Sequence, residues 1–264
     1  YQGQCISHGG QTSYLAWWPV WAAFFELDPA AAPAEQIAQV ARQLAAMDPA
    51  AVIRLPLLAP VLNLAIEDNE VTAQFDAKLR KSSLEALLVD CVRHRAATAR
   101  LMFVIEDTHW MDPLSRDLLE SIGRAALRLS VVLLVTERSP MASGPESLSL
   151  KSLPNTAVLR LESLPPAEAE QLLRQKLARL FGPDVVPTRE LLDLLVARSE
   201  GNPFYLEELL NFLKDQGVAP GDPAAAASLE LPTSLHSLVM SRMDQLTESQ
   251  RMTMKLASVV GRVF

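Results

Sequence analysis

The chain has 264 residues, of which 49% are hydrophobic and 21% are charged, and its net charge is −7. This composition is typical of a globular protein with one large or two smaller domains, and the scattered basic residues predict no direct nucleic-acid binding. No apolar run approaches the roughly 20 residues of a membrane helix, and the two distant cysteines suggest no disulfide framework, so we expect a cytoplasmic protein with no membrane contact.

The amino-terminal region predicts a short strand followed by helices. Residues 2–7 are a candidate strand, and Gly9 and Gly10 end it. From about Ala16 to Ala99, alanine, leucine and glutamine dominate and prolines separate several helical stretches. The last of these stretches is long, because apolar residues recur at roughly helical spacing from Val71 to Val92.

The central region predicts a parallel α/β sheet. Leu101–Ile105 and Val131–Val135 are short continuous apolar runs, which favour strands that are buried on both faces. Between them, Asp112 and Pro113 suit the N-cap and the first position of a helix. Ala157–Leu161 is a candidate third core strand after a loop rich in Ser, Pro and Gly.

The carboxyl-terminal region predicts helices only. The expected helices cover Pro166–Phe181, Thr188–Ser199 and Pro203–Gln216, with Gly182 and Gly217 as helix stops. Residues 218–230 contain Pro, Gly and an alanine run, which indicates a linker. A further helical region begins at Leu231.

Two consecutive acids, Glu106 and Asp107, follow the first buried strand. Ligands of open α/β sheets bind in the crevice outside the carboxyl ends of the strands. Phosphoryl transfer needs a carboxylate there to hold Mg²⁺ through water, and it benefits from a second that orients or deprotonates the attacking water. The alternative is an ordinary polar strand end, which is common in α/β proteins.

The residues from Ile105 to Pro113 read Ile-Glu-Asp-Thr-His-Trp-Met-Asp-Pro. This string resembles the Walker B region of the signal-transduction ATPases with numerous domains (STAND), a class of AAA-related P-loop NTPases. The resemblance implies that Glu106 is the Mg²⁺-associated acid and that Asp107 is the catalytic acid. Trp110 has a simpler interpretation, which is packing of the helix start against the sheet.

Two further motifs are similar to the same class. Leu133–Arg138 looks like the strand that ends at a sensor arginine, which implies that Arg138 approaches the γ-phosphate. Gly201, Asn202 and Pro203 resemble the Gly-x-Pro motif of the helical lid, which implies nucleotide contacts. The alternatives are a surface arginine at a strand end and a well-formed helix start.

The resemblance implies a modular organisation for nearly the whole chain. It divides the chain into an α/β NTPase core at 1–162, a helical lid at 163–217, a linker at 218–230 and the start of a winged-helix domain at 231–264. The sequence departs from the class in one respect, because it has no Gly-x-x-x-x-Gly-Lys-Ser/Thr loop and no Gly-Lys pair. We expect that loop and its strand and helix upstream, roughly 20–30 residues before Tyr1. The segment alone is expected to bind nucleotide poorly or not at all.

The function that the resemblance implies is an ATP-binding and ATP-hydrolysing regulatory switch that uses Mg²⁺. Its partners would be the nucleotide and an output domain in the same longer chain, either a class III adenylate or guanylate cyclase or the DNA-binding domain of a LuxR-type regulator. Self-association and the choice between ATP and GTP stay open. The alternative is a non-catalytic interaction or scaffold module that has kept the NTPase fold.

Overall fold

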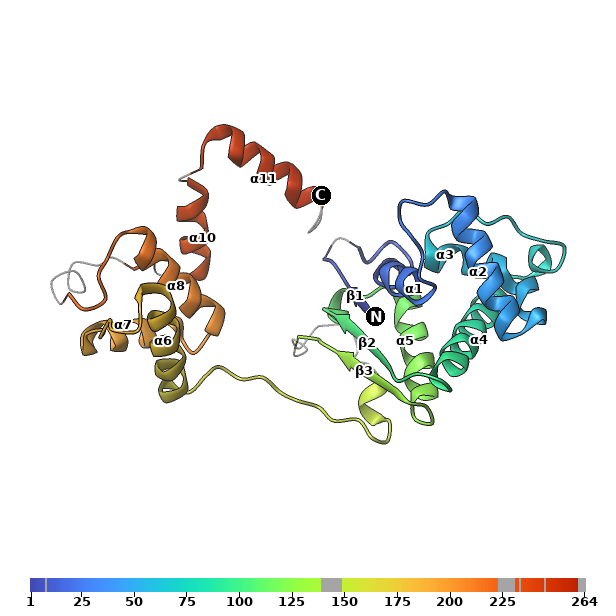
Figure 1. The fold of residues 1–264 in the computed structure, drawn as a ribbon, viewed down its shortest axis with the longest axis horizontal. Helices are drawn as coiled ribbons and strands as arrows, with labels where there is room; N and C mark the ends of the chain where they lie inside the picture. The colour runs from blue at the N-terminus through green and yellow to red at the C-terminus, as the bar shows by residue number, and fades with distance from the viewer. Residues whose placement is uncertain (8, 139–148, 223–230, 233, 245, 261–264) are drawn as a thin grey trace. The chain divides into compact units, whose positions relative to one another are not determined.

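The computed structural model describes residues 1–7, 9–138, 149–222, 231–232, 234–244 and 246–260. The chain divides into two compact units, Tyr1–Val158 and Leu159–Phe264. The first unit contains a small sheet with helices, and the second contains helices only among its described residues (Figure 1).

The sheet of the first unit is parallel and has the order β1-β2-β3, with strands Gln2–Gln4, Leu101–Glu106 and Val131–Val135. Gln2 pairs with Val104, and Leu101 pairs with Val131. The parallel α/β class and both predicted central strands are confirmed. The helices of this unit are α1 (Trp18–Phe24), α2 (Pro33–Met47), α3 (Ala59–Leu62), α4 (Ala77–Ala96) and α5 (Pro113–Ala126), with shorter 3-10 turns η1 (Leu15–Trp17), η2 (Pro49–Leu58), η3 (Thr72–Gln74), η4 (Thr108–Trp110) and η5 (Ser149–Ser152).

One face of the sheet is covered and the other is open. Phe103 and Ile105 are fully buried on the covered face, where Trp21 of α1 and Leu118 of α5 belong to the same core. The open face carries an apolar row in which Met102 is 49% exposed, Val132 58% and Leu134 45%. Parallel sheets are normally covered on both faces, so this sheet has an apolar face that no described segment of its unit fills.

A glycine lets the first helices approach the covered face closely. A Cβ atom on Gly3 would lie 2.1 Å from the carbonyl oxygen of Ala16 and 2.9 Å from Val20 Cγ2. No side chain fits in that space, so glycine is required for η1 and α1 to pack directly on β1. The indole nitrogen of Trp17 then donates to the carbonyl of Ser115, which ties this layer to α5.

The structure confirms the predicted start of α5 and corrects two other expectations. Asp112 caps α5 by accepting from the amide of Ser115 at 3.0 Å. The long helix α4 begins at Ala77 rather than near Val71, because Asp76 caps it there and a 3-10 turn precedes it.

The prediction of a strand at Ala157–Leu161 is wrong. This segment is extended chain without sheet pairing, and the side chains of Leu159 and Leu161 are 84% and 97% exposed. Its apolar pattern suits a strand, but no described strand lies beside it to supply the hydrogen bonds that a strand needs.

The second unit is built from helices around its own core. Its helices are α6 (Pro166–Phe181), α7 (Arg189–Ser199), α8 (Pro203–Asp215), α10 (Leu235–Asp244) and α11 (Glu248–Val260). Leucines from α6, α7 and α8 fill the core, joined by Tyr205, Leu231 and Leu238. The three predicted helices are confirmed to within a residue at each end, and Gly182 and Gly217 follow α6 and α8 with positive φ angles. Most of the expected linker, residues 223–230, lies outside the described residues.

No described helix combines the length and the apolar character that a membrane crossing requires.

Candidate functional site

The two acids lie at the carboxyl-terminal rim of the middle strand. Glu106 is the last residue of β2, and Asp107 follows it at once, with both side chains half-buried. The amide of Cys5 donates to the carbonyl of Glu106 at 2.9 Å, which extends the pairing of β1 with β2 up to the rim. Since the three strands are parallel, residues after β1 and β3 reach the same rim.

Asp107 has an unusual backbone conformation. Its φ is 58° and its ψ is 39°, which is the left-handed region that non-glycine residues seldom occupy and that Asp and Asn tolerate best. The turn bends the chain sharply from β2 into the 3-10 turn η4. A strained residue at a strand end of an α/β sheet is a feature that accumulates at functional sites.

Polar groups from both neighbouring strands hold the acids. Gln2 Nε2 donates to Glu106 Oε1 at 3.2 Å, and Gln4 Nε2 donates to Asp107 Oδ2 at 3.1 Å. On the other side, the amide of Asp107 donates to Thr136 Oγ1 at 3.0 Å. The carboxylates are therefore oriented from β1, while the backbone of Asp107 is held from the end of β3.

Arg138 lies at the same rim, three residues after the end of β3. Its guanidinium carbon is 5.5 Å from the centroid of the Trp110 ring, a cation–π arrangement at the end of η4. The His109 ring packs against the Trp110 ring, with their centroids 4.3 Å apart. Both ring nitrogens of His109 are buried, and neither has a hydrogen-bond partner among the described residues. Native structures rarely leave such groups unpaired.

The thiol of Cys5 lies behind the acids. Burial and, to a smaller extent, the charges of Asp112 and Asp107 raise its pKa from 9.0 to about 12, while Arg116 opposes them. The thiol therefore stays protonated at neutral pH. This buried, neutral group is a packing residue of the rim and is not suited to act as a nucleophile.

The Gly201–Asn202–Pro203 turn lies in the second unit and joins α7 to α8. Gly201 has a φ of 72°, and a Cβ atom there would lie 2.4 Å from the carbonyl oxygen of Leu164. Asn202 Oδ1 caps α8 by accepting from the amides of Phe204 and Tyr205, and Pro203 is its first residue. Local structure thus accounts for each residue of the motif, and nucleotide contact there stays a prediction.

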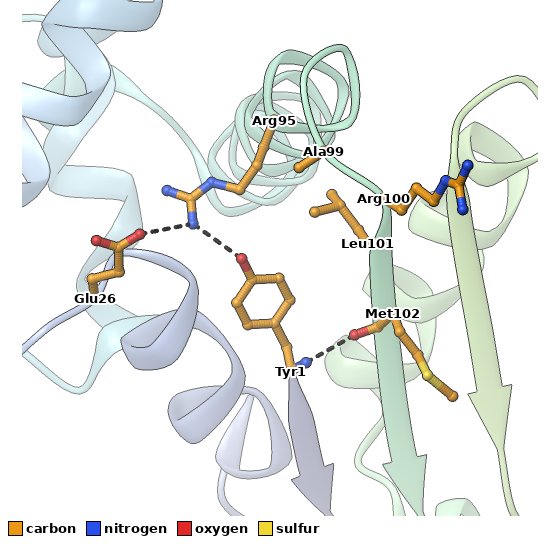
Figure 2. A pocket seen from close by; sticks show the side chains of 7 residues that line it. All are labelled: Tyr1, Glu26, Arg95, Ala99, Arg100, Leu101 and Met102. Atoms are coloured by element: carbon orange, nitrogen blue, oxygen red, sulfur yellow. Dashed lines mark hydrogen bonds and ion pairs between the residues drawn. The ribbon is translucent and has the colours of Figure 1, made fainter.

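A surface pocket of about 650 Å³ lies at the opposite edge of the sheet (Figure 2). It is lined by Tyr1 and by Arg100–Met102 at the amino ends of β1 and β2, together with Arg95. Arg95 donates to the hydroxyl of Tyr1 and to the carbonyl of Phe24, so its guanidinium is engaged in holding α4 against the aromatic core. Ligands of parallel sheets bind at the carboxyl ends of the strands, so we place the candidate site at the acidic rim and not here.

The structure brings together three of the predicted site residues, Glu106, Asp107 and Arg138. Sequence reasoning missed the residues that hold Asp107, which are Gln4 and Thr136. The signal was available, because each is a polar residue at the carboxyl end of a strand next to β2. Strand order is needed to use that signal, and the sequence alone does not supply it.

Comparison with known proteins gives little direct guidance. No protein-family model and no solved structure matches the chain. An uncharacterized protein of Rhizobium meliloti (strain 1021) is 27% identical over 223 residues, which cover 81% of this chain. The matched region makes up 20% of that protein's length, so the chain spans about a fifth of its curated relative.

Proposed function

We propose that the chain is part of an ATP-binding and ATP-hydrolysing regulatory switch. The observation that carries the proposal is the pair Glu106–Asp107 at the carboxyl rim of the middle strand of a parallel sheet. In this proposal Glu106 holds Mg²⁺ through its water shell, and Asp107 orients the attacking water. Both acids stand at the end of β2, and one or two carboxylates are the usual protein contribution to a hydrated Mg²⁺.

The open edge of β3 supports the proposal. Among the described residues no strand pairs with β3 on the side away from β2. The two crossovers from β1 to β2 and from β2 to β3 run in one direction and keep their helices on the covered face. An upstream strand beside β3 would have to connect back across the sheet to β1. That crossover would run in the direction opposite to the other two, so a right-handed connection would place its helix on the open face.

The same geometry predicts where the nucleotide binds. Reversal of the strand order creates a crevice at the carboxyl ends of the strands, which is where doubly wound sheets bind ligands. With an upstream strand beside β3, that crevice would open next to Arg138 and the two acids. A phosphate-binding loop between the upstream strand and its helix would complete the site.

The second unit has a defined part in the proposal. Pro203 and Phe204 are exposed at the start of α8 and offer a flat apolar surface for a base. A nucleotide-dependent change in this unit would pass the nucleotide state on to whatever output domain follows. The alternative is a scaffold module without turnover, and the observation in its favour is that helix capping already explains Gly201 and Asn202.

The test uses a longer version of the protein that includes the residues upstream of Tyr1. We expect it to bind ATP in the presence of Mg²⁺ and to hydrolyse it slowly, as measured by calorimetry and phosphate release. Asp107→Asn should keep the fold, because Asn suits the left-handed conformation, and should lower turnover by about 100-fold or more.

Asp193→Asn is the matched control, because Asp193 is exposed on α7 and pairs with Arg189. It should leave turnover unchanged. Absence of ATP binding by the longer protein would refute the proposal, and full turnover by Asp107→Asn would favour the scaffold alternative.

A further inference from the structure

The end of β3 contacts the turn after β2 at two places. At the near end, the amide of Thr108 and its hydroxyl both donate to the carbonyl oxygen of Thr136, at 3.0 and 3.1 Å. Together with the bond from the Asp107 amide to Thr136 Oγ1, three hydrogen bonds join the residue that follows β3 to residues 107 and 108. At the far end, Arg138 lies over the Trp110 ring.

Only one of these contacts depends on the identity of residue 136. Its carbonyl oxygen is present whatever the side chain, and Thr108 is buried, so the Thr108 contacts would survive most substitutions. The Asp107 amide, in contrast, has the Thr136 hydroxyl as its acceptor. Asp107 is also the residue with the left-handed backbone, so this bond restrains the strained position itself.

We propose that Thr136 is a positioning residue that fixes the backbone of Asp107 and thereby aims its carboxylate. The inference rests on the proposed function, since a rate can depend on the aim of Asp107 only if Asp107 acts on a reaction. Gln4 orients the carboxylate from β1, and Thr136 fixes the main chain from β3.

The test compares Thr136→Val with Thr136→Ser in the longer protein. Valine keeps the shape of threonine and removes the hydroxyl acceptor, whereas serine keeps the acceptor. With Thr136→Val, hydrogen exchange in the peptide that contains Asp107 should be about fivefold faster for one amide. The kcat for ATP should fall about tenfold with an unchanged KM, because positioning and not binding is lost. Thr136→Ser should restore both values.

Thr98→Val is the matched control, since Thr98 is exposed just before the amino end of β2 and its hydroxyl donates to the carbonyl of Arg95. It should change neither the exchange nor the kcat. If Thr136→Val speeds exchange while the kcat stays at the wild-type value, the positioning role is refuted and the proposed function stands. A wild-type protein without turnover refutes the proposed function, and the inference with it. A Thr136→Ser protein as slow as Thr136→Val also overturns the inference, because the hydroxyl would then not be the feature that matters.

Discussion

Residues with positive φ angles occur in both units of the chain, in different surroundings. In the helical unit, Glu200 and Gly201 both have positive φ angles, and the close approach of Leu164 together with the cap of α8 explains why. In the sheet unit, the non-glycine residues with positive φ angles are Tyr14, Glu26, Asn63, Asp107 and Asn155. Asp107 differs from the others in that it directly follows the middle strand β2. Helices α6, α7 and α8 enclose a core of buried leucines, whereas the sheet has an open apolar face. The comparison teaches that the unit with the acidic rim also holds the open apolar face, and that its left-handed Asp107 stands where function is expected.

The largest expected effect on stability tests whether only one face of the sheet is packed. Phe103→Ala removes a fully buried ring and should lower the free energy of unfolding by about 3–5 kcal/mol. Met102→Ala, one residue away on the open face, should cost less than about 1 kcal/mol. All four tryptophans lie at positions 17, 18, 21 and 110, so tryptophan fluorescence during urea unfolding follows the sheet unit alone.

The longer protein sharpens this prediction. If an upstream helix covers the open face, Met102→Ala should cost clearly more there than in the 264-residue chain, because its side chain would become buried. Equal costs in the two proteins would argue against such a cover.

A smaller effect tests the turn of the helical unit. Gly201→Ala should destabilise that unit by about 2–4 kcal/mol, since its Cβ would clash with the Leu164 backbone and its φ is unfavourable. Gly217→Ala is the matched control, because its φ of 66° is similar and nothing lies within 4 Å of the added atom. It should cost about 1 kcal/mol. Circular dichroism should report the loss for Gly201→Ala while the tryptophan transition stays in place, and equal effects of the two substitutions would contradict the structural role of the turn.

The smallest effect at neutral pH concerns the two cysteines, which both belong to the sheet unit. Burial raises the pKa values of Cys5 and Cys91 from 9.0 to about 12. The folded state therefore holds these protons more tightly than the unfolded chain, so their contribution to stability is complete below pH 9 and is lost as the pH rises towards 12.

Urea midpoints of the tryptophan transition should fall over that alkaline range. In Cys91→Ala the fall should be smaller, once the neutral-pH cost of the substitution is subtracted. Thiol labelling at pH 8 should be slow for both residues and should follow unfolding of the sheet unit. Rapid labelling of native Cys5 would contradict its burial.

Local sequence patterns predicted where helices begin well, but they predicted poorly which segments pair as strands. Asp112 and Pro113, or Asn202 and Pro203, mark helix starts because the cap lies within a few residues in sequence. Ala157–Leu161 has the pattern of a strand, but a strand exists only where another strand pairs with it, and no described strand does so here.

The acids of the site could be predicted because their signal, like that of a helix cap, is local. Glu106 and Asp107 follow directly after an apolar run. Their supports could not be predicted, because Gln4 and Thr136 meet Asp107 only after the strands have found their order. The left-handed backbone of Asp107 likewise arises from the contacts at the end of β3 and has no signature in the local sequence.

The pairing of β1 with β2 joins Gln2 to Val104, so a stretch of about 100 residues must fold back before the first strand is in place. Contacts between positions so distant in sequence form slowly, because their loop-closure entropy is large. During synthesis, Gln4 leaves the ribosome long before Asp107 and Thr136, and the rim cannot assemble until the last of them has emerged. The acidic rim is therefore expected to be among the last parts of this unit to form. Helices α1–α4 are synthesised between β1 and β2, so they can fold before β1 has its partner strand.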